Sequence, residues 1–194
     1  MGNERFLSDV KTLRERARRH MAEGAVTPGY KADRGVAIKI LNAALATEIV
    51  CVLRYKRHHA MAKGILSQAV ADEFAEHAAE EQGHADMIAE RIVQLGGEPD
   101  YNPLTLLSRS HSEYAEGKDL TDMIEENLVA ERIAVESYSE MIRFFGHDDP
   151  TSRRMLEEIL AKEEEHAEDL ASLLGRLEAS GAAPRETREA PPKP

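Results

Sequence analysis

The chain of 194 residues has no tryptophan, a single cysteine and only 5% aromatic side chains. The lone thiol, Cys51, excludes an internal disulfide and any zinc or iron–sulfur site built from several cysteines. The shortage of aromatic residues, beside plentiful Ala, Leu, Glu and Arg, favours helices over sheets. The composition therefore predicts an all-α protein, in which Cys51 is most simply a small buried apolar residue.

Positive charge and long apolar runs are also scarce. The net charge of −11 argues against nucleic acid as a default partner of the whole molecule. No window reaches the roughly 18–20 uninterrupted apolar residues of a membrane span, and the first residues do not have the pattern of a signal peptide. We therefore expect a cytoplasmic protein with no membrane partner. With 42% hydrophobic residues, the chain can bury one core and needs no second domain.

Glycine, proline and capping residues divide the chain into helices and connections. We expect an N-terminal amphipathic helix (4–23) and linker within residues 1–32, a four-helix bundle over 33–179, and a disordered Pro-rich tail over 180–194. The long helices of the bundle are expected at 33–63, 67–96, 119–146 and 149–179. The connection over 98–118, with one short helix near 103–114, is long enough to cross the bundle, so the third long helix should run parallel to the second.

The most informative pattern is a Glu-x-x-His motif that occurs in each half of the chain, preceded about one helix upstream by a single glutamate. The single and motif glutamates are 33 residues apart in the first half and 32 in the second (81 − 48 and 163 − 131). Every member lies on the apolar stripe that its helix must bury. The six residues are Glu48, Glu81, His84, Glu131, Glu163 and His166.

Burial of four carboxylates is costly unless they are paired, protonated or bound to metal. The stripes carry no Lys or Arg near these residues, and two divalent ions would offset the four charges. We therefore predict two metal ions, with iron or manganese favoured over zinc by the mixed oxygen and nitrogen ligands. Residues three apart share one helix face, so each motif Glu can bridge both ions while its His binds one. The alternative for any single pair is a solvated Glu and His on a helix surface.

Several other residues have two readings. Tyr55 and Tyr138 each follow a single glutamate by seven residues, and belong either to the core or to the surroundings of the metals. His77 is the main candidate for an auxiliary metal ligand or a residue of the ion access path. The alternative is that it is an ordinary core histidine. The weaker candidates for such a role are His58, His59 and His111. Asp86 and Asp169 are weak candidates for orienting the imidazoles.

Residues 36–178 resemble the ferritin-like superfamily, and within it bacterioferritin, in the stretches LNAALATEIVCVLRY, EEQGHADMIAERIVQLGG and EILAKEEEHAEDL. This arrangement of carboxylates and histidines on four helices is that of ferritin-like di-iron proteins. The resemblance implies that the six residues are ferroxidase ligands for two iron ions, with Glu81 and Glu163 bridging. Tyr55 falls where bacterioferritins keep a tyrosine near the metals.

The chain departs from bacterioferritin in three places. Gln82 occupies the position of the methionine that binds haem, so no haem is expected. A Pro-rich tail replaces the fifth C-terminal helix. The long connection with a short helix resembles Dps proteins, which form twelve-subunit shells. We therefore favour a homo-oligomeric dodecamer over a dimer or a 24-mer.

By resemblance, the expected function is a ferroxidase that oxidises Fe(II) with O2 or H2O2 and stores or detoxifies iron in a hollow shell. One alternative is a manganese catalase- or peroxidase-like enzyme with the same ligands and no storage. Another is a DNA-binding Dps-type shell protein with structural metals. Residues 1–34 carry eight Lys or Arg against five acids, which keeps DNA binding open, although subunit packing is the favoured role of this segment.

Overall fold

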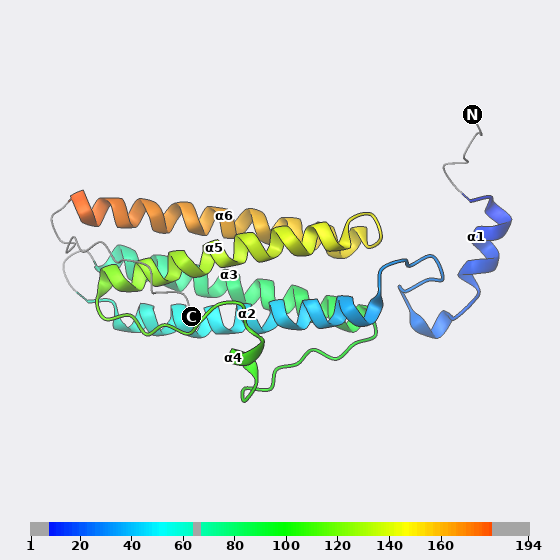
Figure 1. The fold of residues 1–194 in the computed structure, drawn as a ribbon, viewed down its shortest axis with the longest axis horizontal. Coiled ribbons are helices and arrows are strands. Elements are labelled where there is room, and N and C mark those ends of the chain that lie inside the picture. Colours follow the sequence, from blue (N-terminus) through cyan, green and yellow to red (C-terminus); the bar gives the residue numbers. More distant parts are fainter. Residues whose placement is uncertain (1–7, 64–66, 180–194) are drawn as a thin grey trace, which may run out of the picture.

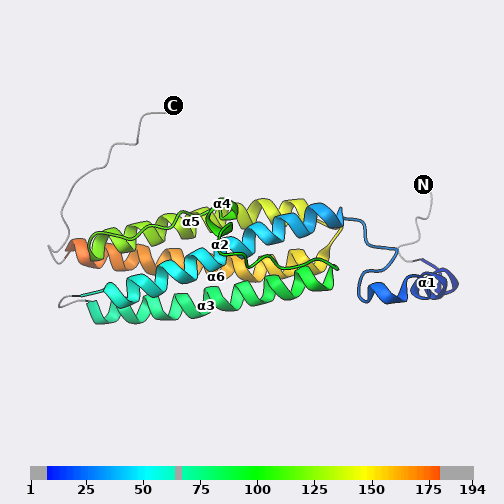
Figure 2. The same cartoon turned by 90° about the horizontal axis from the view of Figure 1, so that it is seen from below.

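The structure, a computed structural model, describes residues 8–63 and 67–179, and all regular elements in these ranges are helical. Four long helices lie side by side in a bundle (Figures 1 and 2). Their bounds are α2 Arg34–Met61, α3 Ser67–Gln94, α5 Leu120–Phe145 and α6 Pro150–Ala179. The smaller elements are α1 Val10–Ala17, the 3-10 turn η1 Met21–Glu23, and α4 Leu106–Arg109. The prediction of an all-α four-helix bundle with an extra N-terminal helix is confirmed.

The helix ends follow the expected local chemistry. Asp33 caps α2 by accepting a hydrogen bond from the Val36 amide at 3.0 Å. At the end of α3, Gly96 adopts φ = +78° and the Gly97 amide donates to the Ile92 carbonyl at 2.9 Å. This left-handed glycine closes the last turn of the helix at low cost. Ser67, expected as a cap, is the first residue of α3, and the expected stop at Gly64 lies outside the described residues.

The connection between α3 and α5 runs back along α2, so that α5 is parallel to α3 as predicted (Figure 1). Near its beginning, the Asn42 side chain donates to the Glu98 carbonyl at 3.1 Å and accepts from the Asp100 amide at 2.7 Å. Farther along, the His111 amide donates to Thr47 Oγ1 at 2.9 Å. These bonds attach an otherwise irregular segment to successive turns of one helix.

The end of the same connection is held by a buried polar group that the sequence analysis missed. Arg54 is 1% exposed, and its guanidinium donates to Asn127 Oδ1 at 2.8 Å and to the Glu113 carbonyl at 2.9 Å. His58 contacts the Ala115 carbonyl at 3.1 Å and Asn127 at 2.9 Å. A buried base therefore lies near the predicted metal ligands, contrary to expectation, but these hydrogen bonds bind it to the connection and α5.

The core consists of two main apolar clusters separated along the bundle. One includes Leu41, Ile88 and Leu156, towards the start of α2 and the end of α3. The other includes Phe74 and Leu170, towards the opposite end. Each fully buried Leu, Ile or Phe contributes about 1.5–3 kcal/mol by transfer from water. The bundle can therefore bury polar groups between the clusters and still fold.

The N-terminal helix is shorter than expected and does not pack on its own bundle. None of α1 is buried, and Val10 and Met21 are 60% and 74% exposed. The helix ends at Ala17 with Arg18 as its C-cap, before the left-handed His20 (φ = 52°). In Figure 1, α1 projects beyond one end of the bundle. The predicted Pro-rich tail, and with it the expected absence of a fifth helix, lies outside the described residues.

Helix α2 contains one long apolar stretch. An 18-residue window in it averages a mean hydropathy of 2.0, enough in length and composition to cross a membrane, and 56% of that window is buried in the bundle. Polar residues such as Asn42, Thr47 and Glu48 interrupt this stretch, so it is apolar only on average. The explanation is packing: α2 contacts α3, α4 and α5, so residues on several of its faces are covered by protein.

Candidate metal centre

The structure brings all six predicted ligand residues together between the two apolar clusters. Each is at most 8% exposed. Their ligand atoms fall into two groups that share Glu81 and Glu163. Glu48 and His84 complete one group, and Glu131 and His166 complete the other. Each helix of the bundle contributes to this cluster, which has the two-fold order that the repeated motif indicates.

The first group surrounds one nitrogen of His84. Its Nδ1 lies 2.9 Å from Glu163 Oε1, 3.3 Å from Glu81 Oε2 and 3.4 Å from Glu48 Oε2. A ring nitrogen can donate only one hydrogen, so it cannot bond well to three oxygens at once. Three carboxylate oxygens converging on one imidazole nitrogen could form the ligand set of a metal ion.

The second group surrounds His166 in the same way. Its Nδ1 lies 3.5 Å from Glu81 Oε1, 3.8 Å from Glu131 Oε2 and 3.9 Å from Glu163 Oε2. Glu81 and Glu163 therefore present one oxygen to each histidine, which is the geometry of bridging carboxylates. Glu48 and Glu131 each face a single histidine, as terminal ligands would.

The same residues leave buried polar atoms without hydrogen-bond partners. These atoms are Glu48 Oε2, Glu81 Oε1, Glu131 Oε2, Glu163 Oε1 and His166 Nδ1. Buried polar atoms in folded proteins almost always have a partner, and the binding of an ion is a recognised reason for an exception. Carboxylate oxygens with one imidazole nitrogen suit iron or manganese. The side chains present thus fit two such ions.

Two tyrosines hold the terminal glutamates from behind. Tyr55 donates its hydroxyl hydrogen to Glu131 Oε1, and Tyr138 donates to Glu48 Oε1. Burial, followed by the charge of the bound glutamate, raises the pKa of both phenols well above the ordinary value, so both stay protonated donors. Each bond occupies the outer carboxylate oxygen and leaves Oε2 directed at the centre.

Glu80 orients His166, a role that the sequence analysis did not foresee. Its Oε2 lies 2.7 Å from His166 Nε2, while Oε1 lies 3.3 Å from Lys162 Nζ. Such a carboxylate fixes the tautomer and direction of a ligating imidazole. Asp169 had been the weak expectation for this role, and Asp86 bonds Gln82 at 3.0 Å instead. Glu80 lies on α3 whereas His166 lies on α6, so residue spacing along α6 could not predict this contact.

Burial and mutual charge shift the protonation of the cluster. Burial, then the charge of Glu81, raises the pKa of Glu48 and of Glu163. For Glu81, burial acts in the same direction, but polar contacts with Glu48, His166 and His84 outweigh it and lower its pKa. Burial disfavours charged histidines, yet the surrounding glutamates raise the pKa of His84 and of His166 to about 10. The metal-free site therefore retains protons that a metal would displace.

The remaining histidines and the cysteine have distinct positions. His77 stacks on His166 with ring centroids 4.0 Å apart, and its Nδ1 is 3.1 Å from the Tyr55 hydroxyl. Burial, then the charge of His166, lowers the pKa of His77 to about 4. His59 contacts the backbone carbonyl of Ala71, as His58 contacts that of Ala115, and His111 is exposed on the surface. Burial raises the pKa of the Cys51 thiol well above its usual value, which makes it unreactive.

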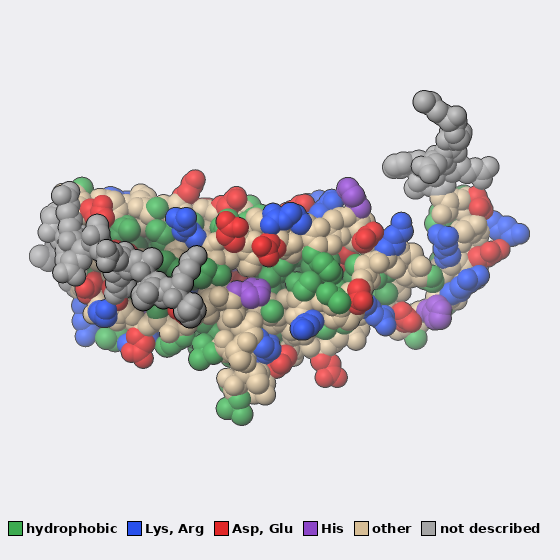
Figure 3. Space-filling view, in the orientation of Figure 1, with side chains coloured by type: hydrophobic (Ala, Val, Ile, Leu, Met, Phe, Trp, Pro, Cys, Tyr) green, Lys and Arg blue, Asp and Glu red, His purple; other side chains and the backbone are tan. Residues whose placement is uncertain are grey.

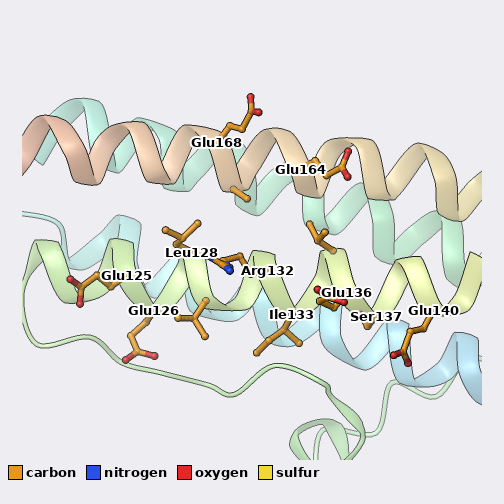
Figure 4. Close-up of a pocket in the computed structure, with 13 residues that line it drawn as sticks. Glu125, Glu126, Leu128, Arg132, Ile133, Glu136, Ser137, Glu140, Glu164 and Glu168 are labelled. Atoms are coloured by element: carbon orange, nitrogen blue, oxygen red, sulfur yellow. The ribbon is translucent and has the colours of Figure 1, made fainter. Parts of the chain in front are cut away.

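A surface hollow lies elsewhere, along the outside of α5 and α6. It has a volume of about 1160 Å³ and an acidic rim that includes Glu125 and Glu136 on α5 and Glu164 and Glu168 on α6 (Figure 4). None of the six ligand residues lines it. The candidate centre is therefore enclosed within the bundle, as expected for a site that takes small ions and not a bulky organic ligand.

Comparison with known proteins agrees with this fold and site. The family profile described as "Ferritin-like domain" matches residues 38–180. Bacterioferritin of Rhodobacter capsulatus is 30% identical over 150 residues, which cover 75% of this chain and 89% of the relative.

Two solved structures are also similar. The dodecameric thioferritin of Bacteroides fragilis, a bacterioferritin-related protein, is 33% identical with a TM-score of 0.75, over 78% of this chain and 91% of its own. A ferritin-like, diiron-carboxylate protein of Bacillus anthracis is 29% identical with a TM-score of 0.66, over 74% and 99% of the two chains.

Proposed function

The chain belongs to the ferritin-like domain family, and we propose that it is a di-iron ferroxidase that oxidises Fe(II) with O2 or H2O2. The observation that carries this proposal is the pair of buried ligand groups that share Glu81 and Glu163. Two ions held by common carboxylates can act together on one oxidant molecule, which a single ion cannot do. Iron is here the substrate as well as the occupant of the site.

The residues have separable tasks in this proposal. Glu81 and Glu163 would each contribute one oxygen to both ions, and Glu48 and Glu131 would each offset one positive charge of a single ion. When bound, the irons supply the electrons that reduce the oxidant. The histidines would be neutral ligands, and the four carboxylates supply the negative charge of the site. This negative charge would stabilise the positive charge that the irons gain on oxidation. Enclosure in the bundle excludes bulk water and larger reductants.

We further propose that copies of the chain form a hollow shell that stores iron, with twelve subunits favoured. Support comes from the similarity to the dodecameric thioferritin and from apolar side chains that the single chain leaves exposed. Leu104 and Leu107 at α4 are 91% and 63% exposed, on a part of the chain that projects from the bundle (Figure 3). With Val10 and Leu13 of α1, they are the expected subunit contacts.

Anaerobic titration of metal-free protein with Fe(II), followed by O2 or H2O2, tests the proposal. We expect tight binding of at least two Fe(II) per bundle and a fast rise in absorbance near 300 nm. Glu131→Ala should abolish the fast phase, whereas Glu136→Ala, an exposed residue of the same helix, should not. Oxidation no faster than in buffer would refute the ferroxidase proposal. Uptake of many further irons per subunit would add storage.

Other predictions from the sequence stay predictions. Manganese suits the same ligands, and disproportionation of H2O2 by manganese-loaded protein would favour a catalase-like enzyme. Exposed arginines of α1 keep DNA binding as an alternative, which salt-sensitive retardation of DNA would reveal. The absence of haem rests on Gln82 and is tested by the Soret absorbance of the purified protein. The cytoplasmic location is likewise a prediction.

A further inference from the structure

A second cluster of potential metal ligands lies where α3 faces α6, outside the six-residue centre. It consists of Glu73, His77 and Asp169, whose ligand atoms all lie within 4.8 Å of one another. His77 is 2% exposed, whereas the two acids are half-buried and reachable from water. The cluster thus has a buried imidazole at its base and two carboxylates at its opening.

The hydrogen-bond directions around His77 leave one of its nitrogens without a suitable partner. The Tyr55 hydroxyl hydrogen is donated to Glu131, so the Tyr55 oxygen must accept from His77 Nδ1. A neutral imidazole has a single N–H, and Nε2 therefore carries a lone pair. That lone pair lies 3.4 Å from Glu73 Oε1. The nitrogen lone pair and the carboxylate oxygen are both acceptors, so they cannot form a hydrogen bond with each other. A cation bound between them would remove this unfavourable contact.

The local charge also favours a cation. Burial, then the charges of Asp169 and Glu76, raises the pKa of Glu73, so negative charge is crowded here. Arg176 offsets this effect only in part, because the pKa remains raised. Two carboxylates and one imidazole, with the remaining positions open to water, suit a divalent first-row metal.

We propose that Glu73, His77 and Asp169 bind one divalent metal ion, a third per subunit, directly beside the two-metal centre. The two sites are adjacent because His77 stacks on His166 and bonds the tyrosine that holds Glu131. On the ferroxidase function proposed above, on which this role rests, the ion is substrate Fe(II) held next to the centre before oxidation.

Anaerobic Co(II) binding tests the site without any oxidation step. Dialysis with metal analysis should find a third tightly bound equivalent in the wild-type protein. Glu73→Gln with Asp169→Asn should remove that equivalent, or weaken its binding by at least about tenfold. Conversely, Glu131→Gln with Glu163→Gln should weaken the other two and retain the third. Crystals of the wild-type protein soaked in Zn(II) should show anomalous density between Glu73, His77 and Asp169.

Glu76→Gln is the control for local charge, because it removes one negative charge one turn away from Glu73 without removing a ligand. An equal loss in this variant would show mere electrostatic attraction and overturn the site. Only two equivalents in the wild-type protein, with no anomalous density at the three residues, would overturn it as well. A third equivalent in a protein that does not oxidise Fe(II) would refute the ferroxidase and leave this site standing.

Discussion

Tyr55 on α2 donates its hydroxyl hydrogen to Glu131 on α5, so a residue of the first half of the chain holds a terminal carboxylate of the second. Tyr138 and Glu48 make the reciprocal bond. The two helix pairs are therefore connected through residues that we propose as metal ligands. Removal of either bond should therefore lower both the stability of the bundle and the affinity of the site for metal.

Tyr55→Phe should destabilise the metal-free protein by about 1–3 kcal/mol, because Glu131 Oε1 loses its donor while it stays buried. Fe(II) binding should weaken by about ten- to a hundredfold, the usual cost of losing an orienting partner. Urea unfolding and anaerobic Fe(II) titration measure the two effects. Tyr114→Phe, at a residue that is 39% exposed, is the control, and equal effects in both variants would contradict the role of Tyr55.

Replacement by glutamine should lower the number of bound Fe(II) ions less at a proposed terminal glutamate than at a proposed bridging one. Glu48→Gln removes an oxygen from the His84 group alone, so one Fe(II) should still bind near His166. Glu81→Gln removes charge from both groups, so neither ion should bind tightly. Metal analysis after anaerobic dialysis distinguishes the variants. Identical stoichiometry in the two would contradict the assignment of Glu81 as a bridge.

Metal binding should strengthen as the pH rises. His84 and His166 have folded pKa values of about 10 against an ordinary 6.5. Their contribution to the stability of the metal-free protein is therefore full below pH 6.5 and is lost as the pH rises towards 10. The raised pKa values of Glu48 and Glu163 act in the same direction, since their protons are also lost as the pH rises.

Thermal unfolding with and without metal checks this expectation. The metal-free protein should lose stability between pH 6.5 and 10, and the stabilisation by Mn(II), used as a redox-stable probe, should grow over the same range. Metal addition to weakly buffered protein should release protons. A metal-induced stabilisation that does not change with pH, with no proton release, would contradict the protonated state of the empty site.

Asp149→Ala should destabilise the bundle by about 3–5 kcal/mol, because it leaves Arg91 buried without its partner. Asp149 is 2% exposed and bonds Arg91 at 2.9 Å, the Ser152 amide at 2.9 Å and the Tyr30 hydroxyl at 2.9 Å. Chemical unfolding measures the loss, and Asp148→Ala at the exposed neighbouring position is the control. Losses of similar size in the two variants would contradict the proposed role of Asp149.

Asp149 should also make the stability of the bundle depend on pH, in the direction opposite to that of His84 and His166. Although burial opposes it, hydrogen bonds from Ser152, Arg91 and Tyr30 lower the pKa of Asp149 below 3.8. Its stabilisation is therefore present above pH 3.8 and is lost as the pH falls through the lowered value. In Asp149→Asn, the loss of stability over this acidic range should be shallower than in the wild-type protein.

Much of the bundle and the position of the centre could be predicted because they depend on short-range rules. Asp33 caps its helix through its own third neighbour, and Gly96 ends a helix because glycine readily adopts a left-handed backbone. Glu81 and His84 share a face because three residues are nearly one helical turn. Repetition of the motif in both halves made it improbable that these buried carboxylates were incidental.

The N-terminal helix shows where short-range rules fail. Apolar spacing predicted a helix over 4–23, yet α1 has eight residues and buries none of them. An amphipathic pattern predicts that one face of a helix can be buried, but it does not predict which surface covers that face. Among residues 8–63 and 67–179 no such surface covers Val10 and Leu13, which are 60% and 48% exposed.

The sequence by itself determined which residues are able to bind metal and on which helix faces they lie, since both follow from residue type and helical periodicity. Only the tertiary structure decided which groups support them. Glu80 meets His166 because α3 lies beside α6, and Arg54 bonds Glu113 and Asn127 because the long connection returns along α2. These partners are 86, 59 and 73 residues apart in the chain. No periodicity links positions so distant, and only the packing of the helices brings them into contact.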